Sequence, residues 1–182
     1  MISTGTLDVD GSFSVSEDIT FSRAGRLKLS GAVNDLGTMT NSMGTVVYDG
    51  ADQDVLVDTY YGLEIDGSGV KTLPTSNITI NGDLTLTAGS LAYNSGSSSK
   101  LITLKGSVYG SGTITASTSS IFKIDGDGTN QEIKGISSDY IGVRLSGSAN
   151  ATTTGDITAK YLDLLSGSTG TFTIDGETFT IN

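Results

Sequence analysis

The chain contains no cysteine, no histidine and no tryptophan, and it has one proline among 182 residues. Without cysteine it can form neither a disulfide scaffold nor a redox dithiol, and without cysteine and histidine it cannot build the usual zinc sites. The absence of histidine excludes a Ser-His-Asp triad and any other mechanism that uses a histidine base. Much enzymatic and metal chemistry is therefore excluded by composition alone.

Charge is also scarce. Only 16% of the residues are charged, and 20 acidic against 10 basic side chains give a net charge of −10. An acidic balance argues against nucleic acid and against anionic membranes as partners. The apolar runs are short, such as Val55–Val57, so we expect no membrane insertion.

The first six residues show neither the basic region nor the apolar core of a secretory signal. We therefore expect either that a leader has been removed or that the protein leaves its cell by another route. Virion assembly followed by lysis is one such route.

Glycine, serine and threonine fill 76 of the 182 positions, and a repeat organises the rest. Its unit is a pair of apolar residues separated by one residue, and the pairs recur at steps of 17 to 21 residues. The pairs are Leu7/Val9, Leu27/Leu29, Val46/Tyr48, Leu63/Ile65, Leu84/Leu86, Ile102/Leu104, Phe122/Ile124, Val143/Leu145, Leu162/Leu164 and Phe179/Ile181.

A glycine follows each of the first nine pairs after two or three positions, usually preceded by Asp or Ser, as at Asp49-Gly50 and Asp125-Gly126. Alternation with period two places both apolar side chains on one face of a short strand, and Asp-Gly or Ser-Gly then turns the chain. The pattern predicts an all-β parallel β-helix, or β-solenoid, of about ten coils of about 19 residues in one domain, 1–182. A β-sandwich also has short strands with regular turns, but it gives no reason for one template to recur at a fixed period.

A longer period overlies the coil repeat. The segment beginning at Gly37 resembles that beginning at Gly112, and the segment beginning at Tyr60 resembles that beginning at Tyr140. The offsets of 75 to 80 residues predict two internal modules of about four coils each, at about 27–101 and 102–178.

These strands and Asp-Gly turns, together with Tyr60–Ile65 and Asn81–Gly89, resemble the repeats of adhesin-like parallel β-helix proteins of bacterial surfaces and of phage fibre or decoration proteins. The resemblance implies a right-handed parallel β-helix and a role in structure or adhesive display. It carries no catalytic motif.

The repeat starts a few residues from Met1 and stops within a coil at residues 179–182, with no amphipathic helix or charged cap at either end. An uncapped solenoid exposes core and unpaired backbone at its ends. We therefore expect a slice of a longer solenoid, a subunit that stacks head to tail into a fibre, or one that is capped by a partner or in a trimer.

Two acidic loops are candidate metal sites. Residues 49–54 contain Asp49, Asp52 and Asp54, and residues 125–132 contain Asp125, Asp127 and Asn130. Oxygen-rich loops suit Ca²⁺, but the second loop has neither the glycine nor the final glutamate of an EF-hand. Because Asp-Gly is also the turn expected in each coil, the alternative is that these acids are solvated turn residues. We expect no required cofactor.

Carbohydrate processing is the main enzymatic alternative for a β-helix, and it needs two positioned carboxylates. Aromatic platforms for sugars are few, because tryptophan is absent and the chain has seven tyrosines. Tyr60, Tyr61 and Tyr140 are among these tyrosines. A groove with convergent carboxylates and exposed tyrosines would favour binding or cleavage of carbohydrate, whereas smooth faces with open ends would favour assembly.

The sequence therefore predicts a non-enzymatic structural protein that forms an extended surface element. It would be a virion fibre or decoration protein, or a cell-surface adhesin or filament module. The expected location is the extracellular surface or the virion exterior. The expected partners are copies of itself or a larger particle, with glycans as a further class and no nucleic acid.

Overall fold

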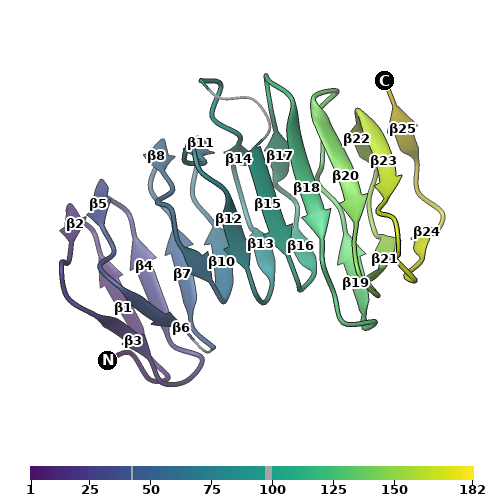
Figure 1. The fold of residues 1–182 in the computed structure, drawn as a ribbon. Coiled ribbons are helices and arrows are strands. Elements are labelled where there is room, and N and C mark those ends of the chain that lie inside the picture. Colours follow the sequence, from purple (N-terminus) through teal and green to yellow (C-terminus); the bar gives the residue numbers. More distant parts are fainter. Residues whose placement is uncertain (42, 97–99) are drawn as a thin grey trace.

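The computed structural model describes residues 1–41, 43–96 and 100–182. Within these ranges all regular structure is β-strand, and the chain winds into an elongated stack of coils with its termini at opposite ends (Figure 1). Neighbouring strands pair in parallel, as Leu7 with Leu27 and Val143 with Leu162. The predicted parallel β-solenoid is confirmed. The described residues include no helix that is long and apolar enough to cross a membrane.

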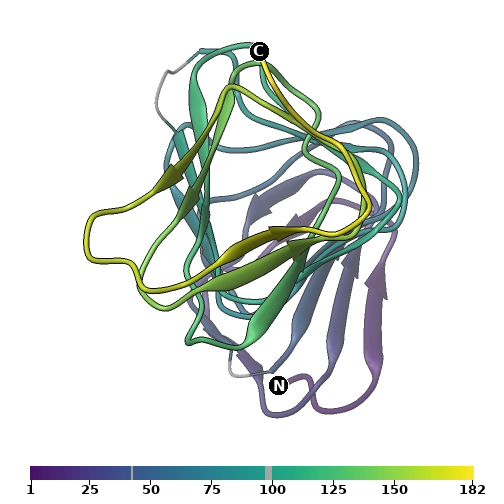
Figure 2. The same ribbon diagram turned by 90° about the vertical axis from the view of Figure 1, so that its right-hand side faces the viewer.

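Each complete coil has three faces, which meet at three corners (Figure 2). In the described residues, face 1 carries β1 (Thr6–Val9), β4 (Arg26–Leu29), β7 (Thr45–Tyr48), β10 (Gly62–Ile65), β13 (Leu84–Leu86), β16 (Val108–Gly110), β19 (Asn130–Ile133), β21 (Asn150–Thr153) and β24 (Phe172–Ile174). Face 2 carries β2 (Phe13–Ser14), β5 (Val33–Asp35), β8 (Gln53–Asp54), β11 (Val70–Thr72), β14 (Ser90–Ala92), β17 (Thr113–Thr115), β22 (Ile157–Ala159) and β25 (Phe179–Ile181). Face 3 carries β3 (Ile19–Phe21), β6 (Met39–Asn41), β9 (Thr59–Tyr60), β12 (Ile78–Ile80), β15 (Lys100–Leu104), β18 (Ser120–Ile124), β20 (Ile141–Leu145) and β23 (Tyr161–Leu164).

The solenoid is right-handed. In Figure 2, which looks from the C-terminal end, the chain runs anticlockwise as it approaches the viewer. This is the hand that a right-handed strand twist favours for crossover connections between parallel strands.

The expected number of coils needs one correction, because the structure has about nine coils of about 20 residues instead of ten. The first five apolar pairs of the repeat lie on face 1, the next four on face 3 and the last on face 2. Leu84 pairs with Val108, not with Ile102, which pairs instead with Ile78. All three faces use the same apolar alternation, so a change of face between Leu84 and Ile102 leaves the spacing almost unchanged. The division into two modules stays a prediction.

The core is a column of inward side chains from all three faces. Along face 1 the stacked pairs include Leu63 on Leu84 and Ile65 on Leu86, and all four side chains are buried. On face 3, Phe122 stacks between Ile102 and Val143. Burial of these apolar surfaces is the main stabilising contribution, at about 25 cal/mol per Å².

Three tyrosines lie inside the core with their hydroxyl groups paired. The Tyr93 hydroxyl donates to the Ile121 carbonyl (2.7 Å), the Tyr60 hydroxyl donates to the Leu56 carbonyl (2.7 Å), and the Tyr48 hydroxyl lies 3.2 Å from that of Tyr60. Burial raises the pKa of all three phenols above 10.

This burial predicts a loss of stability in alkali. Above pH 10 an unfolded tyrosine releases its proton while the buried one keeps it, so each such group costs about 1.4 kcal/mol of unfolding free energy per pH unit. Urea unfolding at pH 8 and pH 11 should show a smaller loss for Tyr93→Phe than for the wild type. Equal losses of unfolding free energy in the two proteins would show that Tyr93 does not contribute to the loss of stability in alkali.

The corners carry the polar loops. We call the corner from face 1 to face 2 corner 1, and the corner from face 3 to face 1 corner 3. Corner 1 includes residues 49–52, and corner 3 includes residues 81–83, 105–107 and 125–129. The glycine turns that follow the apolar pairs lie at these corners, so the two predicted acidic loops occupy different edges of the solenoid.

Candidate functional site

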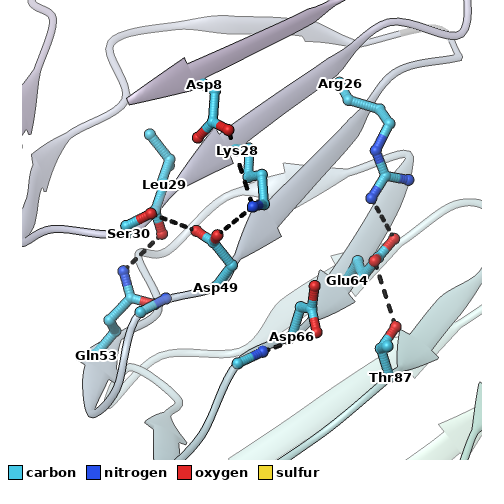
Figure 3. Close-up of polar contacts among 12 residues, drawn as sticks. Asp8, Arg26, Lys28, Leu29, Ser30, Asp49, Gln53, Glu64, Asp66 and Thr87 are labelled. Atoms are coloured by element: carbon cyan, nitrogen blue, oxygen red, sulfur yellow. Dashed lines mark hydrogen bonds and ion pairs between the residues drawn. The ribbon is translucent and has the colours of Figure 1, made fainter. Parts of the chain in front are cut away.

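The acidic loop at corner 1 is built into a network of ion pairs and hydrogen bonds on face 1 (Figure 3). Asp49 contacts Lys28 Nζ through Oδ2 (2.6 Å) and accepts a hydrogen bond from Ser30 Oγ at Oδ1 (2.9 Å). The hydrogen bond and charge of Asp49 raise the pKa of Lys28, which also lies 3.8 Å from Asp8. Both oxygens of the Asp49 carboxylate are therefore used to join neighbouring coils.

The other acids of this loop point elsewhere. Asp52 Oδ1 accepts a hydrogen bond from the Val70 amide of the next coil (2.8 Å), and Asp54 is exposed on β8. Between them, the buried Gln53 donates through Nε2 to the carbonyls of Leu29 and Gly31 and accepts from the Gly50 amide. Asp49, Asp52 and Gln53 thus link coils, whereas Asp54 faces solvent.

A second ion pair on face 1 bridges two coils. Arg26 Nη2 lies 2.8 Å from Glu64 Oε2, and Thr87 Oγ1 donates to Glu64 Oε1 (Figure 3). Because Arg26 is on β4 and Glu64 on β10, the pair spans β7, where the outward residue Val47 is fully buried. The ion-paired side chains on face 1 therefore cover apolar surface as well as pairing charges.

Lys71 is a buried charged residue that sequence reasoning missed. It occupies an inward position of β11, between Gln53 and Leu91, and its side chain is buried. Its Nζ donates to the backbone carbonyls of Gly50 (2.7 Å), Ala51 (2.7 Å) and Ser68 (2.8 Å). Burial lowers the Lys71 pKa, and the nearby carboxylates oppose that effect. The sequence signal that could have identified it is a lysine at a position where the alternating pattern calls for an apolar residue.

The second acidic loop lies at corner 3. Asp125 contacts Lys123 Nζ (3.1 Å) and accepts from Ser146 Oγ (2.7 Å). Asp127 Oδ1 accepts from the amide and hydroxyl of Thr129. The bonds from Thr129 lower the pKa of Asp127. Burial acts to raise the pKa of Asp125, but the contacts with Ser146 and Lys123 outweigh it, so that pKa is lowered as well. Asn130 Oδ1 accepts from Thr152 Oγ1 instead of facing the two aspartates.

Neither loop gathers a complete metal cage. Among the residues that the structure describes, no group of three or more Asp or Glu side chains could hold a metal ion. The two loops also lie on different corners, so they do not combine into one site. Calcium binding by Asp49, Asp52, Asp54, Asp125, Asp127 or Asn130 stays a prediction.

A hollow of about 580 Å³ lies along corner 3, and we call it the corner hollow. The polar and aromatic side chains that line it come from four successive coils: Tyr61, Asn81, Asp83, Lys105, Asp125, Asp127 and Thr129. Its volume is in the range of small-molecule sites. Tyr61 is 36% exposed, whereas Tyr60 is in the core and Tyr140 lies outside the hollow. The hollow is therefore lined by three carboxylates and one exposed tyrosine.

The two end coils expose core side chains. At the N-terminal end an apolar hollow of about 200 Å³ is lined by residues that include Ile2, Leu7 and Phe13, and Leu7 is 47% exposed. At the C-terminal end Ile174 is 50% and Ile181 58% exposed. In the described ranges β1 pairs only with β4, β24 only with β21 and β25 only with β22. Each end therefore presents strand edges beside apolar surface.

Comparison with known proteins found no matching family model, no matching curated protein and no matching solved structure. The β-solenoid fold and the geometry of its surfaces are accordingly the basis for function.

Proposed function

We propose that this protein is a non-enzymatic structural element that assembles with copies of itself through its two ends. It would form a fibre, decoration or adhesin-like module on a virion or cell exterior, as the sequence resemblance also implies. The observation that carries the proposal is that both ends of residues 1–182 expose apolar side chains, half-exposed Leu7 at one end and half-exposed Ile174 and Ile181 at the other. In a longer chain, further coils would cover the same surfaces by the same stacking.

The geometry supports stacking of the last coil of one copy on the first coil of the next. Both ends carry parallel strands on face 1, so β24 of one copy can pair with β1 of the next on that face. When the contact joins two different surfaces, the complex still has one free surface of each kind. Further copies can therefore add at both ends, and a filament forms. The unpaired strand edges would gain backbone hydrogen bonds, and the apolar end residues would leave water.

Charge sets the conditions for this assembly. The net charge of −10 and acidic residues in both end coils, such as Asp8 and Asp175, oppose contact between ends at low ionic strength. At physiological salt the Debye length falls to about 8 Å, which weakens this repulsion. Association should therefore increase with added salt.

The experiment replaces one apolar side chain with an acidic one at each end. Leu7→Asp blocks the N-terminal end and Ile181→Asp blocks the C-terminal end, so neither variant alone should extend beyond a monomer at physiological salt. A mixture of the two should form a one-to-one dimer, because each supplies the end that the other lacks. Sedimentation velocity and electron microscopy of wild type, variants and mixture, with calcium and with chelator, measure this.

Val57→Asp is the matched control, because Val57 is an exposed apolar residue on the side of the solenoid. It should assemble like the wild type. A wild type that stays monomeric at every concentration and salt would overturn the proposal. Side-by-side trimers that survive both end substitutions would overturn stacking through the ends.

A further inference from the structure

We propose that the corner hollow binds an uncharged carbohydrate, with Tyr61 as the stacking platform and Asp83 and Asp127 as hydroxyl acceptors. This is a binding site that does not depend on assembly, because the hollow lies along the side of the solenoid and away from both end coils. No cleavage is proposed.

The aromatic platform is held in place by the fold. A Cβ at Gly82 would lie 2.9 Å from the Tyr61 carbonyl oxygen and 3.1 Å from the Tyr61 ring, so the ring packs closely on this glycine. The Gly82 amide donates to the Tyr61 carbonyl (2.7 Å). The ring remains partly exposed in the hollow. An aromatic face of this kind suits the C–H face of a sugar ring, and the supporting glycine limits the conformational entropy lost on binding.

The acceptors are also fixed before any ligand arrives. Asp83 Oδ1 accepts the Ser107 amide (2.9 Å), and Asp127 Oδ1 accepts the Thr129 amide (3.2 Å) and hydroxyl (2.8 Å). One oxygen of each carboxylate is engaged, by the next coil for Asp83 and by the same loop for Asp127, which orients the other oxygen. Ionised oxygens in fixed positions form strong hydrogen bonds with hydroxyl donors.

A buried acceptor without a partner in the described ranges lies beside the hollow. Gln131 is buried, and its Oε1 is the buried side-chain polar atom for which the described residues provide no hydrogen-bond partner. It lies against Gly126, which lines the hollow. The corresponding glutamine at corner 1, Gln53, is fully bonded through both its oxygen and its nitrogen. Leaving a buried acceptor unpaired costs about 1–3 kcal/mol. Gln131 does not itself line the hollow, so a ligand hydroxyl can pair with Oε1 only if the Gly126 turn moves.

The charges of the hollow select among sugars. Asp83, Asp125 and Asp127 outnumber Lys105, so the hollow is acidic and repels uronic or sialic acids. Asn81 and Lys105 supply donors for hydroxyl or ring oxygens. The combination of an aromatic ring, several acceptors and few donors fits a neutral, polyhydroxylated ligand.

The test is a nuclear magnetic resonance titration of the full chain, in chelator, with hexasaccharides of glucose, galactose, mannose and N-acetylglucosamine. At least one should shift the amide signals of Gly82, Gly106 and Gly126, with a Kd of about 0.1–1 mM. Tyr61→Ala and Asp127→Asn should each weaken that binding by about tenfold or more. Tyr109→Ala and Asp52→Asn, matched changes outside the hollow, should leave it unchanged.

Absence of shifts with all four sugars at about 10 mM would overturn the proposal. Equal binding by Tyr61→Ala, Asp127→Asn and wild type would also overturn it, as would equal binding of an oligogalacturonate. Sedimentation of the same samples separates this result from the assembly proposal, because the hollow variants keep both ends intact.

Discussion

Replacing Lys71 with methionine is expected to lower the free energy of unfolding by about 3 kcal/mol or more. Methionine keeps much of the apolar stem, but it removes the ammonium that three carbonyls share, those of Gly50, Ala51 and Ser68. These carbonyls belong to two successive turns at corner 1, so their loss of a donor weakens the contact between two coils. Urea unfolding followed by circular dichroism at one pH measures the change.

Lys105→Met is the matched control for this prediction. Lys105 is exposed at corner 3, and changes at exposed sites without specific contacts usually stay within about 0.5 kcal/mol. If Lys71→Met were as stable as this control, water or a rearranged turn would have to satisfy the three carbonyls. The internal lysine would then not be required for the stability of corner 1.

The corner glycines provide the second large effect. Gly67 has a φ of 70° and Gly167 a φ of 82°, in the left-handed region that favours glycine. A Cβ at Gly67 would collide with the Asp49 carbonyl of the preceding coil, whereas a Cβ at Gly167 would meet no atom within 4 Å. The two positions therefore share the backbone strain and differ in the clash.

We expect Gly167→Ala to cost about 1–2 kcal/mol for the unfavourable φ alone. Gly67→Ala should cost at least about 2 kcal/mol more, because the neighbouring coil must also move apart. Thermal or urea unfolding of both variants measures the difference. Equal losses would mean that backbone conformation, and not the close approach of coils, determines the need for glycine at corner 1.

The local patterns of the sequence determined the fold class. Apolar residues at alternate positions can bury one side of a short strand, and Asp-Gly or Ser-Gly can turn the chain, whatever lies next to them. The repetition of both at a near-constant period leaves little choice except stacked coils. This reasoning found the parallel solenoid and the acidic turns at Asp49 and Asp125.

The same reasoning could not assign strands to faces. Leu84 and Ile102 carry the same local pattern, and only the pairing of Leu84 with Val108 and of Ile102 with Ile78 shows that they belong to different faces. Because the apolar pairs change face along the chain, the ten pairs correspond to about nine coils. It also placed the two acidic loops on separate corners, where Asp49 joins coils and Asp127 lines the corner hollow.

The sequence by itself determined that this chain is an acidic β-solenoid without cysteine or histidine chemistry, because composition and period are local properties that need no coordinates. The tertiary structure alone decided which side chains from different coils meet. Tyr61, Asp83 and Asp127 are up to 66 positions apart, and they share one hollow only because each coil returns the chain to the same corner. Lys71 is internal for the same reason, since the carbonyls it binds belong to successive turns stacked at that corner.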